Sequence, residues 1–306
     1  MHPFTKHHAE SVSALGEEAL IGRIRRWLGP VSPRAPFGIG DDCAVLPPVR
    51  GRQLITVDPV IYGRHFDDHV PARAAGAKLL KRNLSDLAAM GGQPVAAVLA
   101  LTLDARVSLR WIEDFYRGLA ACARRHAVPI VGGDLTQADG IIAASLTLLG
   151  KPAGSRVLTR TGAQMGDLLY VTGRLGGSLR SGHHWKFTPR LAEGVWLAQR
   201  PEVRAMMDLS DGLAKDLSAL TPRGAVPVLE HALPRRAGCD LRAALTDGED
   251  YELVFAVSGG ADTAALERAW KKKFPRVPLT RIGRFARTLP AGVPNLADYH
   301  GYEHLR

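Results

Sequence analysis

Five short acidic segments punctuated by glycine recur along this otherwise basic chain, and they constrain its fold more than any other feature. They read G-I-G-D-D, N-L-S-D-L-A-A-M-G, G-G-D, M-D-L-S-D-G and G-E-D-Y-E-L, at residues 38–42, 83–91, 132–134, 207–212 and 248–253. A single aspartate beside a glycine usually marks a turn. Five such segments, each at the start or end of an expected element, predict a fold that brings distant carboxylates to one site. That site would hold several Mg²⁺ ions and a polyphosphate.

Length and composition favour two domains without a nucleic-acid partner. The chain has 306 residues, 46% of them apolar, which is more than one hydrophobic core usually covers. The net charge of +10 would suit a polyanion. The arginines are dispersed, however, and the dense run 271–273 closes an expected helix, where cations are favourable. No nucleic-acid-binding pattern occurs, so we expect no nucleic-acid partner.

Cysteine usage and hydropathy predict a cytoplasmic protein without a membrane partner. Cys43, Cys122 and Cys239 lie far apart and form no C-x-x-C pair, which disfavours a zinc site or a disulfide framework. No apolar run reaches transmembrane length, and the N-terminus lacks a signal-type apolar core. The histidine-rich residues 1–10 are expected to be a frayed tail, with metal binding as the less favoured alternative.

Hydrophobic periodicity and turn signals predict an α+β fold. Helices are expected over 15–28, 72–90, 108–126, 189–200, 211–220 and 262–273. Strands are expected over 53–58, 95–103, 129–131, 141–149, 168–172, 226–230, 251–257 and 277–282. Residues 151–166 read as a linker, which divides the chain into domains 1–150 and 151–306. Because helices and strands do not alternate strictly, α+β domains are favoured over a doubly wound sheet.

The chain lacks the common protein devices for binding phosphate. It contains no G-x-x-x-x-G-K-[ST] loop, no kinase catalytic loop and no G-x-G-x-x-G after a strand. If the chain binds a polyphosphate, metal ions must neutralise it, with help from arginine, lysine and backbone N–H groups, and Mg²⁺ prefers oxygen ligands. Each aspartate alone is weak evidence, since Asp86 could be an ordinary helix residue and Asp134 a turn residue. Taken jointly, the acidic segments offer six candidate ligands: Asp42, Asp58, Asp86, Asp134, Asp208 and Asp211.

The ordered set of motifs resembles the thiamine-monophosphate kinase family. To the five acidic segments it adds D-x-x-x-x-G-x-H-F, G-G-D-x-T and R-x-G-A-x-x-G-D-x-x-Y-V-T-G, collinear from about residue 16 to residues 301–304. That family belongs to a larger group of ATP-binding synthetases, which includes aminoimidazole ribonucleotide (AIR) synthetase and selenophosphate synthetase. The resemblance implies a two-domain PurM-like α+β fold. Its N-terminal domain would bind ATP and Mg²⁺ and pair its mixed sheet across a homodimer, and its C-terminal domain would be an α/β sandwich.

The resemblance also implies an activity and a set of site residues. The activity is Mg²⁺-dependent phosphorylation of thiamine monophosphate to thiamine diphosphate, by direct in-line transfer of the γ-phosphoryl group of ATP without a covalent nucleophile. The implied Mg²⁺ ligands are Asp42, Thr56, Asp58, Asp86, Asp134, Asp208 and Asp211. The implied ATP contacts are Gly133, Asp134, Arg160 and Ser210. The implied substrate contacts are His65, Glu249 and Tyr302. From the residues alone, His65 reads as a half-buried structural histidine and Tyr302 as a terminal anchor.

Several residues depart from the family pattern. Val57 removes a possible hydroxyl ligand, and Pro59 restricts the backbone at Asp58. Lys81 and Arg82 replace small apolar residues and would either bind phosphate or face solvent. Residues 184–190 keep an H-x-x-x-x-P-R pattern.

Two alternative functions remain open. One is another ATP-dependent synthetase of the same group, resembling the AIR or selenophosphate enzymes. The absence of a cysteine before Gly38 disfavours the selenophosphate branch. The other is a degenerate, non-catalytic nucleotide-binding paralogue or a basic nucleic-acid binder. Retention of all six aspartates disfavours this second alternative.

Overall fold

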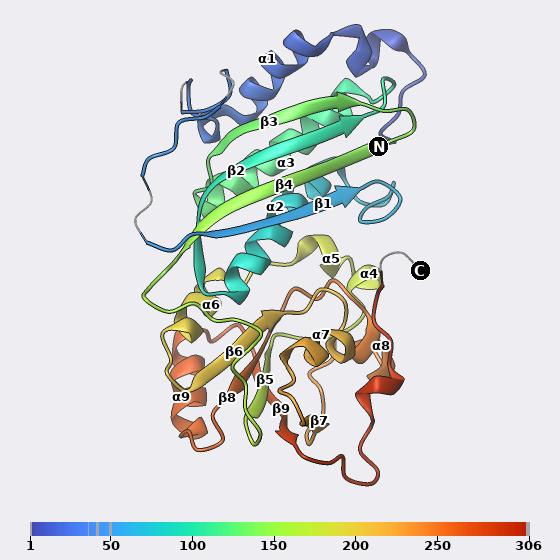
Figure 1. Ribbon diagram of the computed structural model, residues 1–306. Helices are drawn as coiled ribbons and strands as arrows, with labels where there is room; N and C mark the ends of the chain where they lie inside the picture. Colours follow the sequence, from blue (N-terminus) through green and yellow to red (C-terminus); the bar gives the residue numbers. More distant parts are fainter. Residues whose placement is uncertain (1, 36, 41–42, 49–50, 304–306) are drawn as a thin grey trace. The chain divides into compact units, whose positions relative to one another are not determined.

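The chain folds into two compact units in a computed structural model, which describes residues 2–35, 37–40, 43–48 and 51–303. Unit 1 comprises Met1–Leu84 and Gln93–Lys151, and unit 2 comprises Ser85–Gly92 and Pro152–Arg306. Figure 1 shows the elements of both units. The division differs from a single cut near residue 150, because Ser85–Gly92 belongs with the C-terminal part of the chain.

Unit 1 is built on a four-stranded mixed sheet in the order β1-β4-β2-β3. Strands β1 and β4 pair antiparallel, whereas β2 and β3 pair in parallel, as the expected mixed sheet requires. Helices α2 and α3 cover one face of this sheet (Figure 1). The elements are α1 (Glu17–Leu28), β1 (Leu54–Ile61), α2 (Ala72–Ala89), β2 (Gly92–Leu103), α3 (Leu109–His126), β3 (Ile130–Gln137) and β4 (Ile142–Pro152), with short 3₁₀ turns at His8–Glu10, Val12–Ala14 and Gly29–Val31.

Strand β1 continues through Pro59 to Ile61, beyond its expected end at Asp58. Proline cannot donate a hydrogen bond to a neighbouring strand, so inside a sheet it is confined mainly to edge strands. β1 lies at the edge of its sheet, and Pro59 stands opposite Ser145 of β4. The edge position therefore explains why the strand tolerates this residue.

The N-terminal residues do not form the frayed tail that the sequence predicts. Phe4 forms an isolated bridge with Val107, and Ser11 forms another with Ser108. The amide of Thr5 also donates to the carbonyl of Arg106. These backbone contacts hold the histidine-rich segment against the start of α3. The side-chain composition of the segment does not predict this pairing, because backbone groups form it.

Helices α2 and α3 touch through two glycines. A Cβ atom on Gly118 would lie 1.9 Å from the carbonyl oxygen of Arg73, and one on Gly76 would lie 1.9 Å from the carbonyl oxygen of Phe115. Real Cβ atoms do not approach backbone this closely, so only glycine permits this spacing. The contact fixes α2 against α3.

Unit 2 is built on a five-stranded sheet in the order β6-β8-β5-β9-β7. The recorded pairings β5–β8, β5–β9, β6–β8 and β7–β9 are all antiparallel. The elements are β5 (Leu168–Thr172), α4 (Ser178–Ser181), α5 (His183–Lys186), α6 (Leu191–Ala198), β6 (Val203–Asp208), α7 (Leu213–Leu220), β7 (Val226–Leu229), α8 (Leu241–Thr246), β8 (Leu253–Val257), α9 (Thr263–Lys273) and β9 (Leu279–Ala286), with a 3₁₀ turn at Leu296–Asp298.

The sheet of unit 2 is buried on both faces. Side chains alternate along a strand, so Val254 and Ala256 of β8 join one apolar cluster and Phe255 joins another. Leu217 of α7 belongs to the first cluster and Trp270 of α9 to the second. This two-sided burial explains why β8 reads as an uninterrupted apolar run, L-V-F-A-V.

Sequence periodicity misses strand β6 and the short helices α4, α5 and α8. β6 carries Ala205, Met206 and Met207, residues that favour helices more than strands. It is a strand because it pairs with β8 along its length. Tertiary pairing thus overrides local propensity at the strand that delivers Asp208.

We predict that Gly118→Ala destabilises the protein. The added methyl group must push α3 away from α2, and such overpacking costs about 1–3 kcal/mol or more. Gly22→Ala is the matched control, because nothing lies within 4 Å of the added atom in α1. The control should be neutral or gain up to about 1 kcal/mol from helix propensity. Urea unfolding measures both changes, and equal free energies of unfolding for the two variants would contradict the close contact.

Candidate functional site

Two acidic segments of unit 2 are joined by backbone hydrogen bonds. The amide of Glu249 donates to the carbonyl of Ser210 at 2.7 Å, and the amide of Tyr251 donates to the carbonyl of Leu209 at 2.7 Å. In return, the amide of Leu209 donates to the carbonyl of Glu252 at 2.9 Å. M-D-L-S-D-G and G-E-D-Y-E-L therefore form one scaffold, although they are far apart in the sequence.

A third acidic segment joins this scaffold at Asp208, the last residue of β6. Asp208 is 3% exposed, and its Oδ2 accepts a 2.7 Å hydrogen bond from the hydroxyl of Ser85. Ser85 and Asp86 belong to N-L-S-D-L-A-A-M-G at the end of α2. The serine of that motif had no predicted role. The structure shows that it orients a predicted metal ligand.

The C-terminal segment is tied to Asp211. Lys215 donates one hydrogen bond to Asp211 Oδ2 at 2.7 Å and another to the carbonyl of Tyr302 at 2.6 Å. The amide of Tyr302 donates to the carbonyl of Asp211 at 2.9 Å. Tyr302 is 42% exposed, so its ring stays accessible while its backbone is fixed. A predicted metal ligand and a predicted substrate contact thus share one anchoring lysine.

Asp216 fixes the turn that carries a predicted phosphate contact, Ser210, and a predicted metal ligand, Asp211. Its Oδ2 accepts the amides of Ser210 at 2.9 Å and of Asp211 at 3.0 Å. Burial raises the pKa of the Asp216 carboxyl to about 7, and the Asp211 charge adds to this, whereas the two amides and the Arg160 guanidinium oppose it. The exposed Arg160 therefore acts on the same turn as Ser210.

A buried ion pair fixes the end of G-E-D-Y-E-L. Arg190 holds Glu252 with two hydrogen bonds, from Nε at 2.7 Å and from Nη2 at 2.6 Å. The hydroxyl of Thr172 donates to Glu252 Oε2 at 2.7 Å. Gly173 packs against this carboxylate, and a Cβ atom at residue 173 would lie only 2.0 Å from Glu252 Oε1. The arginine of the H-x-x-x-x-P-R pattern is therefore the counter-ion of this glutamate.

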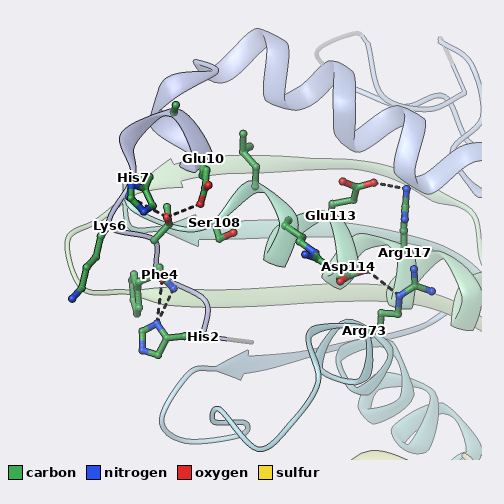
Figure 2. A pocket seen from close by; sticks show the side chains of 14 residues that line it. His2, Phe4, Lys6, His7, Glu10, Arg73, Ser108, Glu113, Asp114 and Arg117 are labelled. Atoms are coloured by element: carbon green, nitrogen blue, oxygen red, sulfur yellow. Dashed lines mark hydrogen bonds and ion pairs between the residues drawn. The ribbon is translucent and has the colours of Figure 1, made fainter.

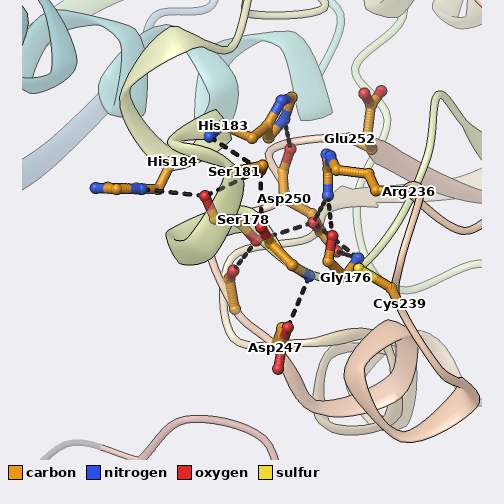
Figure 3. Close-up of polar contacts among 12 residues, drawn as sticks. Gly176, Ser178, Ser181, His183, His184, Arg236, Cys239, Asp247, Asp250 and Glu252 are labelled. Carbon is orange, nitrogen blue, oxygen red and sulfur yellow. Dashed lines mark hydrogen bonds and ion pairs between the residues drawn. The ribbon is translucent and has the colours of Figure 1, made fainter.

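A second buried carboxylate, Asp250, lies at the centre of a polar network (Figure 3). It is fully buried and accepts hydrogen bonds from the amide of Gly176, the hydroxyl of Ser178 and the guanidinium of Arg236. The ring Nε2 of His183 lies 2.9 Å from the carbonyl oxygen of Asp250. The sequence motifs alone predict no role for Asp250 or Arg236.

In unit 1, Arg82 is paired with the predicted metal ligand Asp58. Its Nη2 lies 3.1 Å from Asp58 Oδ1, and its Nη1 donates to the carbonyl of Pro59. The Arg82 side chain is 10% exposed. Of the two expectations for Arg82, solvent exposure is therefore wrong. Phosphate binding by this residue stays a prediction.

Gly133 and Asp134 lie on the exposed part of strand β3. Asp134 Oδ2 accepts a 2.9 Å hydrogen bond from the hydroxyl of Thr136. Both residues line a cavity of about 80 Å³ together with Ile21 and Ile24 of α1. The aspartate is therefore accessible beside an apolar recess.

His65 is half-buried and has specific partners. Its Nδ1 accepts the amide of Ile61 at 3.1 Å, and its carbonyl accepts the Lys78 ammonium at 2.6 Å. This is the structural environment that the residues alone suggest. Contact of the same ring with the substrate stays a prediction.

Asp42 lies outside the described residues. Among the residues that the structure does describe, no group of three or more histidine, cysteine, aspartate or glutamate side chains is placed to hold a metal ion. A metal held only by protein ligands is thus not seen in the described ranges. The convergence of the six aspartates stays a prediction.

A larger cavity, of about 1070 Å³, lies between the N-terminal segment and α3 in unit 1. Figure 2 shows its lining, in which Arg73 pairs with Asp114 and Arg117 pairs with Glu113. None of the predicted site residues lines it. We therefore do not take this cavity as the candidate site, although it is larger than the cavity beside Asp134.

The described helices include none with the length and apolar character needed to cross a bilayer.

Comparison with known proteins places the chain in a class and then in a family. Residues 40–151 match the model of the AIR synthase related protein N-terminal domain, which agrees with the two-unit α+β fold. A curated thiamine-monophosphate kinase of Rhodopirellula baltica is 35% identical, over 87% of this chain and 86% of its own length. The chain belongs to the thiamine-monophosphate kinase family.

Solved structures agree with this assignment. The thiamine-monophosphate kinase of Stenotrophomonas maltophilia K279a is 33% identical and covers 90% of this chain and 95% of its own, with a TM-score of 0.74. AaThiL complexed with AMPPCP and TMP is 28% identical and covers 91% and 94%, with a TM-score of 0.67. The predicted PurM-like α+β fold is confirmed.

We predict a pH-dependent contribution of His183 to stability. Burial, reinforced by the Arg236 guanidinium, lowers the pKa of His183 from 6.5 to about 4. Between these values the unfolded chain binds a proton that the folded ring excludes. Stability from this group is therefore present above pH 6.5 and is lost as the pH falls toward 4. Thermal unfolding of the wild type should show this loss.

His183→Gln is the matched variant, because its amide can still donate to the Asp250 carbonyl but cannot titrate. Its melting temperature should fall less than that of the wild type between pH 7 and pH 5. Parallel profiles for the two proteins would contradict the neutral, buried state of His183.

Proposed function

We propose that this protein phosphorylates thiamine monophosphate to thiamine diphosphate with ATP, in a Mg²⁺-dependent, in-line transfer of the γ-phosphoryl group. Family membership over most of the chain carries this proposal. The complex of AaThiL with AMPPCP and TMP supports it, since AMPPCP is an ATP analogue. The acceptor phosphate is already ionised near neutral pH, so the reaction needs positioning and charge neutralisation rather than a covalent nucleophile.

The donor chemistry of the predicted ligands fits Mg²⁺. Asp58, Asp86, Asp134, Asp208 and Asp211 offer hard oxygen atoms, as would Thr56 and Asp42. Mg²⁺ is usually held by one or two carboxylates together with phosphate oxygens and water, rather than by an all-protein cage. A protein-only cluster is therefore not required for nucleotide-bound ions. When bound, the ions would screen the negative charge of the transferred and leaving groups.

Residues of both units would contact the nucleotide. Arg160 and Ser210 would contact ATP phosphates, and Asp216 fixes the turn that presents the Ser210 amide. Gly133 and Asp134 of β3 would lie beside the nucleotide. Arg82 adds a permanent positive charge beside Asp58, the carboxylate that would hold a metal ion.

His65, Glu249 and Tyr302 would bind thiamine monophosphate. A carboxylate such as Glu249 can accept hydrogen bonds from an aminopyrimidine, and an aromatic face such as Tyr302 suits a flat cationic ring. Tyr302 is exposed and Glu249 is partly exposed, so both could meet a ligand. A cytoplasmic location, as the cysteine usage predicts, would suit an enzyme that consumes ATP.

We also propose a homodimer formed through the sheet of unit 1. Ile55 is 72% exposed and Val57 is 60% exposed, and alternation along β1 places both on one face. Val98 of β2 is 40% exposed. Exposed apolar side chains on a strand face are typical of an interface with another chain.

Product formation tests the proposed activity. The wild type, incubated with ATP, Mg²⁺ and thiamine monophosphate, should form thiamine diphosphate, detected by chromatography. Absence of product with all three present would favour the degenerate paralogue. Turnover with a different acceptor would favour another synthetase of the group.

Asp134→Asn and Asp208→Asn should each lower kcat by about 100-fold or more, because removing one preorganised electrostatic group from a transition state costs of that order. Asp139→Asn, in the exposed turn after β3, is the control and should retain activity. Thermal unfolding should show that all three variants fold. Full activity in both site variants would refute their role as metal ligands.

We predict that Ile55→Glu combined with Val57→Glu converts a dimer into a monomer. Two charges on the β1 face would have to be buried without partners in the interface. Sedimentation velocity measures the change, with Ile141→Glu as a control at an exposed apolar residue outside β1. A wild type that sediments as a monomer would contradict the dimer.

A further inference from the structure

Two residues of G-E-D-Y-E-L adopt a backbone conformation that their side chains disfavour. Glu249 has φ 61° and Tyr251 has φ 51°, both in the left-handed region that favours glycine. Residues persist there only when surrounding contacts hold them, and such residues gather at functional sites. Asp250 lies between them and is fully buried. The contacts of Asp250 therefore help to hold the loop, together with the backbone bonds of Glu249 and Tyr251 to Ser210 and Leu209.

Four groups from three segments converge on Asp250. Its carboxylate accepts the amide of Gly176 at 3.1 Å, the hydroxyl of Ser178 at 3.1 Å and Nη1 of Arg236, and its carbonyl lies 2.9 Å from the ring of His183. Figure 3 shows these groups surrounding the aspartate. The side chain therefore ties the loop to the β5–α4 connection and to residue 236.

Arg236 is itself fixed in place. Its Nη1 also donates to the carbonyl of Gly176 at 2.9 Å, and the side chain is 12% exposed. Its Nη2 is buried and has no hydrogen-bond partner among the described residues. A buried guanidinium with one carboxylate partner depends strongly on that partner.

The strained loop also fixes the direction of the Glu249 side chain. The hydroxyl of Tyr251 donates to Glu249 Oε1 at 3.2 Å. The Tyr251 ring stacks on Phe187, with 4.0 Å between ring centroids. The Ser178 hydroxyl also donates to the carbonyl of Gly248, immediately before Glu249. These three contacts limit where the Glu249 carboxylate can point.

We infer that the buried Arg236–Asp250 pair, with Ser178, is a positioning device that holds Glu249 in its binding orientation and so sets the affinity for the aminopyrimidine end of thiamine monophosphate. This rests on the proposed function of Glu249. Asp250, Arg236 and Ser178 touch no substrate in this role, because they act through the backbone of residues 248–251. The proposed ATP contact Ser210 has a separate anchor, because its amide donates to Asp216 Oδ2 at 2.9 Å, so we expect ATP binding to change less.

The test compares Asp250→Asn and Ser178→Ala with the wild type. Both should raise KM for thiamine monophosphate by about 10-fold or more, since a small misplacement at a site can cost up to about 100-fold. KM for ATP should change less than about 2-fold. Ser178→Ala removes only one hydroxyl, so it keeps the proposal testable if Asp250→Asn fails to fold.

The matched control is Asp104→Asn in unit 1. Asp104 is 1% exposed and is likewise held by an arginine and a glycine amide, since it accepts Arg106 Nη2 at 2.7 Å and the Gly140 amide at 2.6 Å. This variant should lose thermal stability with both KM values unchanged. If the two test variants behave like it, the pair is merely structural and the inference is overturned.

Amide hydrogen exchange separates this inference from the proposed function. Asp250→Asn should speed exchange at the amides of Glu249 and Tyr251, which donate to Ser210 and Leu209, without affecting the core of β8. If the wild type does not phosphorylate thiamine monophosphate, the proposed function fails, and exchange at these two amides still decides whether Asp250 holds the loop. Unchanged exchange would overturn the positioning role.

Discussion

Unit 2 depends on hydrogen-bond donors that pair with its buried carboxylates. These donors come from distant parts of the chain. A buried charge or polar group is costly unless it is paired. Glu252 accepts hydrogen bonds from Arg190 and Thr172, and Asp250 forms an ion pair with Arg236. Asp208 accepts a hydrogen bond from the hydroxyl of Ser85. Each partner comes from a different segment. Satisfying the carboxylates therefore brings the loops of the candidate site together.

The same constraint separates two kinds of acidic residue. Asp250 and Glu252 have a structural role, because their oxygens accept hydrogen bonds from buried donors. Glu249 and Asp134 are partly or fully exposed and could meet a ligand. Within G-E-D-Y-E-L, the buried carboxylates therefore hold the scaffold, whereas Glu249 is available to a ligand. A basic chain, with net charge +10, can hold such a cluster and a polyphosphate without a large excess of negative charge.

The sequence predicts most elements whose local pattern agrees with their final environment. Strand Leu168–Thr172 has the expected bounds, and the helix expected from residue 108 begins at Leu109. The sequence does not predict β6, because its pairing with β8 outweighs the helix propensity of its methionines and alanine. β1 extends past Pro59 because only its edge position makes that residue harmless.

The candidate site is predictable only in part, for a physical reason. The acidic motifs predict Asp208 as a metal ligand, and the family resemblance implies roles for Ser210 and Glu249; the structure joins their segments within unit 2. The sequence does not predict roles for Ser85, Arg236 or Lys215, because these roles arise from three-dimensional contacts with partners far along the chain. The pairing of Arg82 with Asp58 is of the same kind.

We propose that the dispersed aspartates meet around a metal-bound nucleotide. Anomalous diffraction from crystals grown with Mn²⁺ and a non-hydrolysable ATP analogue would locate the ions. We expect Mn²⁺ peaks between the nucleotide phosphates and the carboxylates of Asp86, Asp134 and Asp208. Nucleotide density with Mn²⁺ bound away from all three aspartates would contradict the claim.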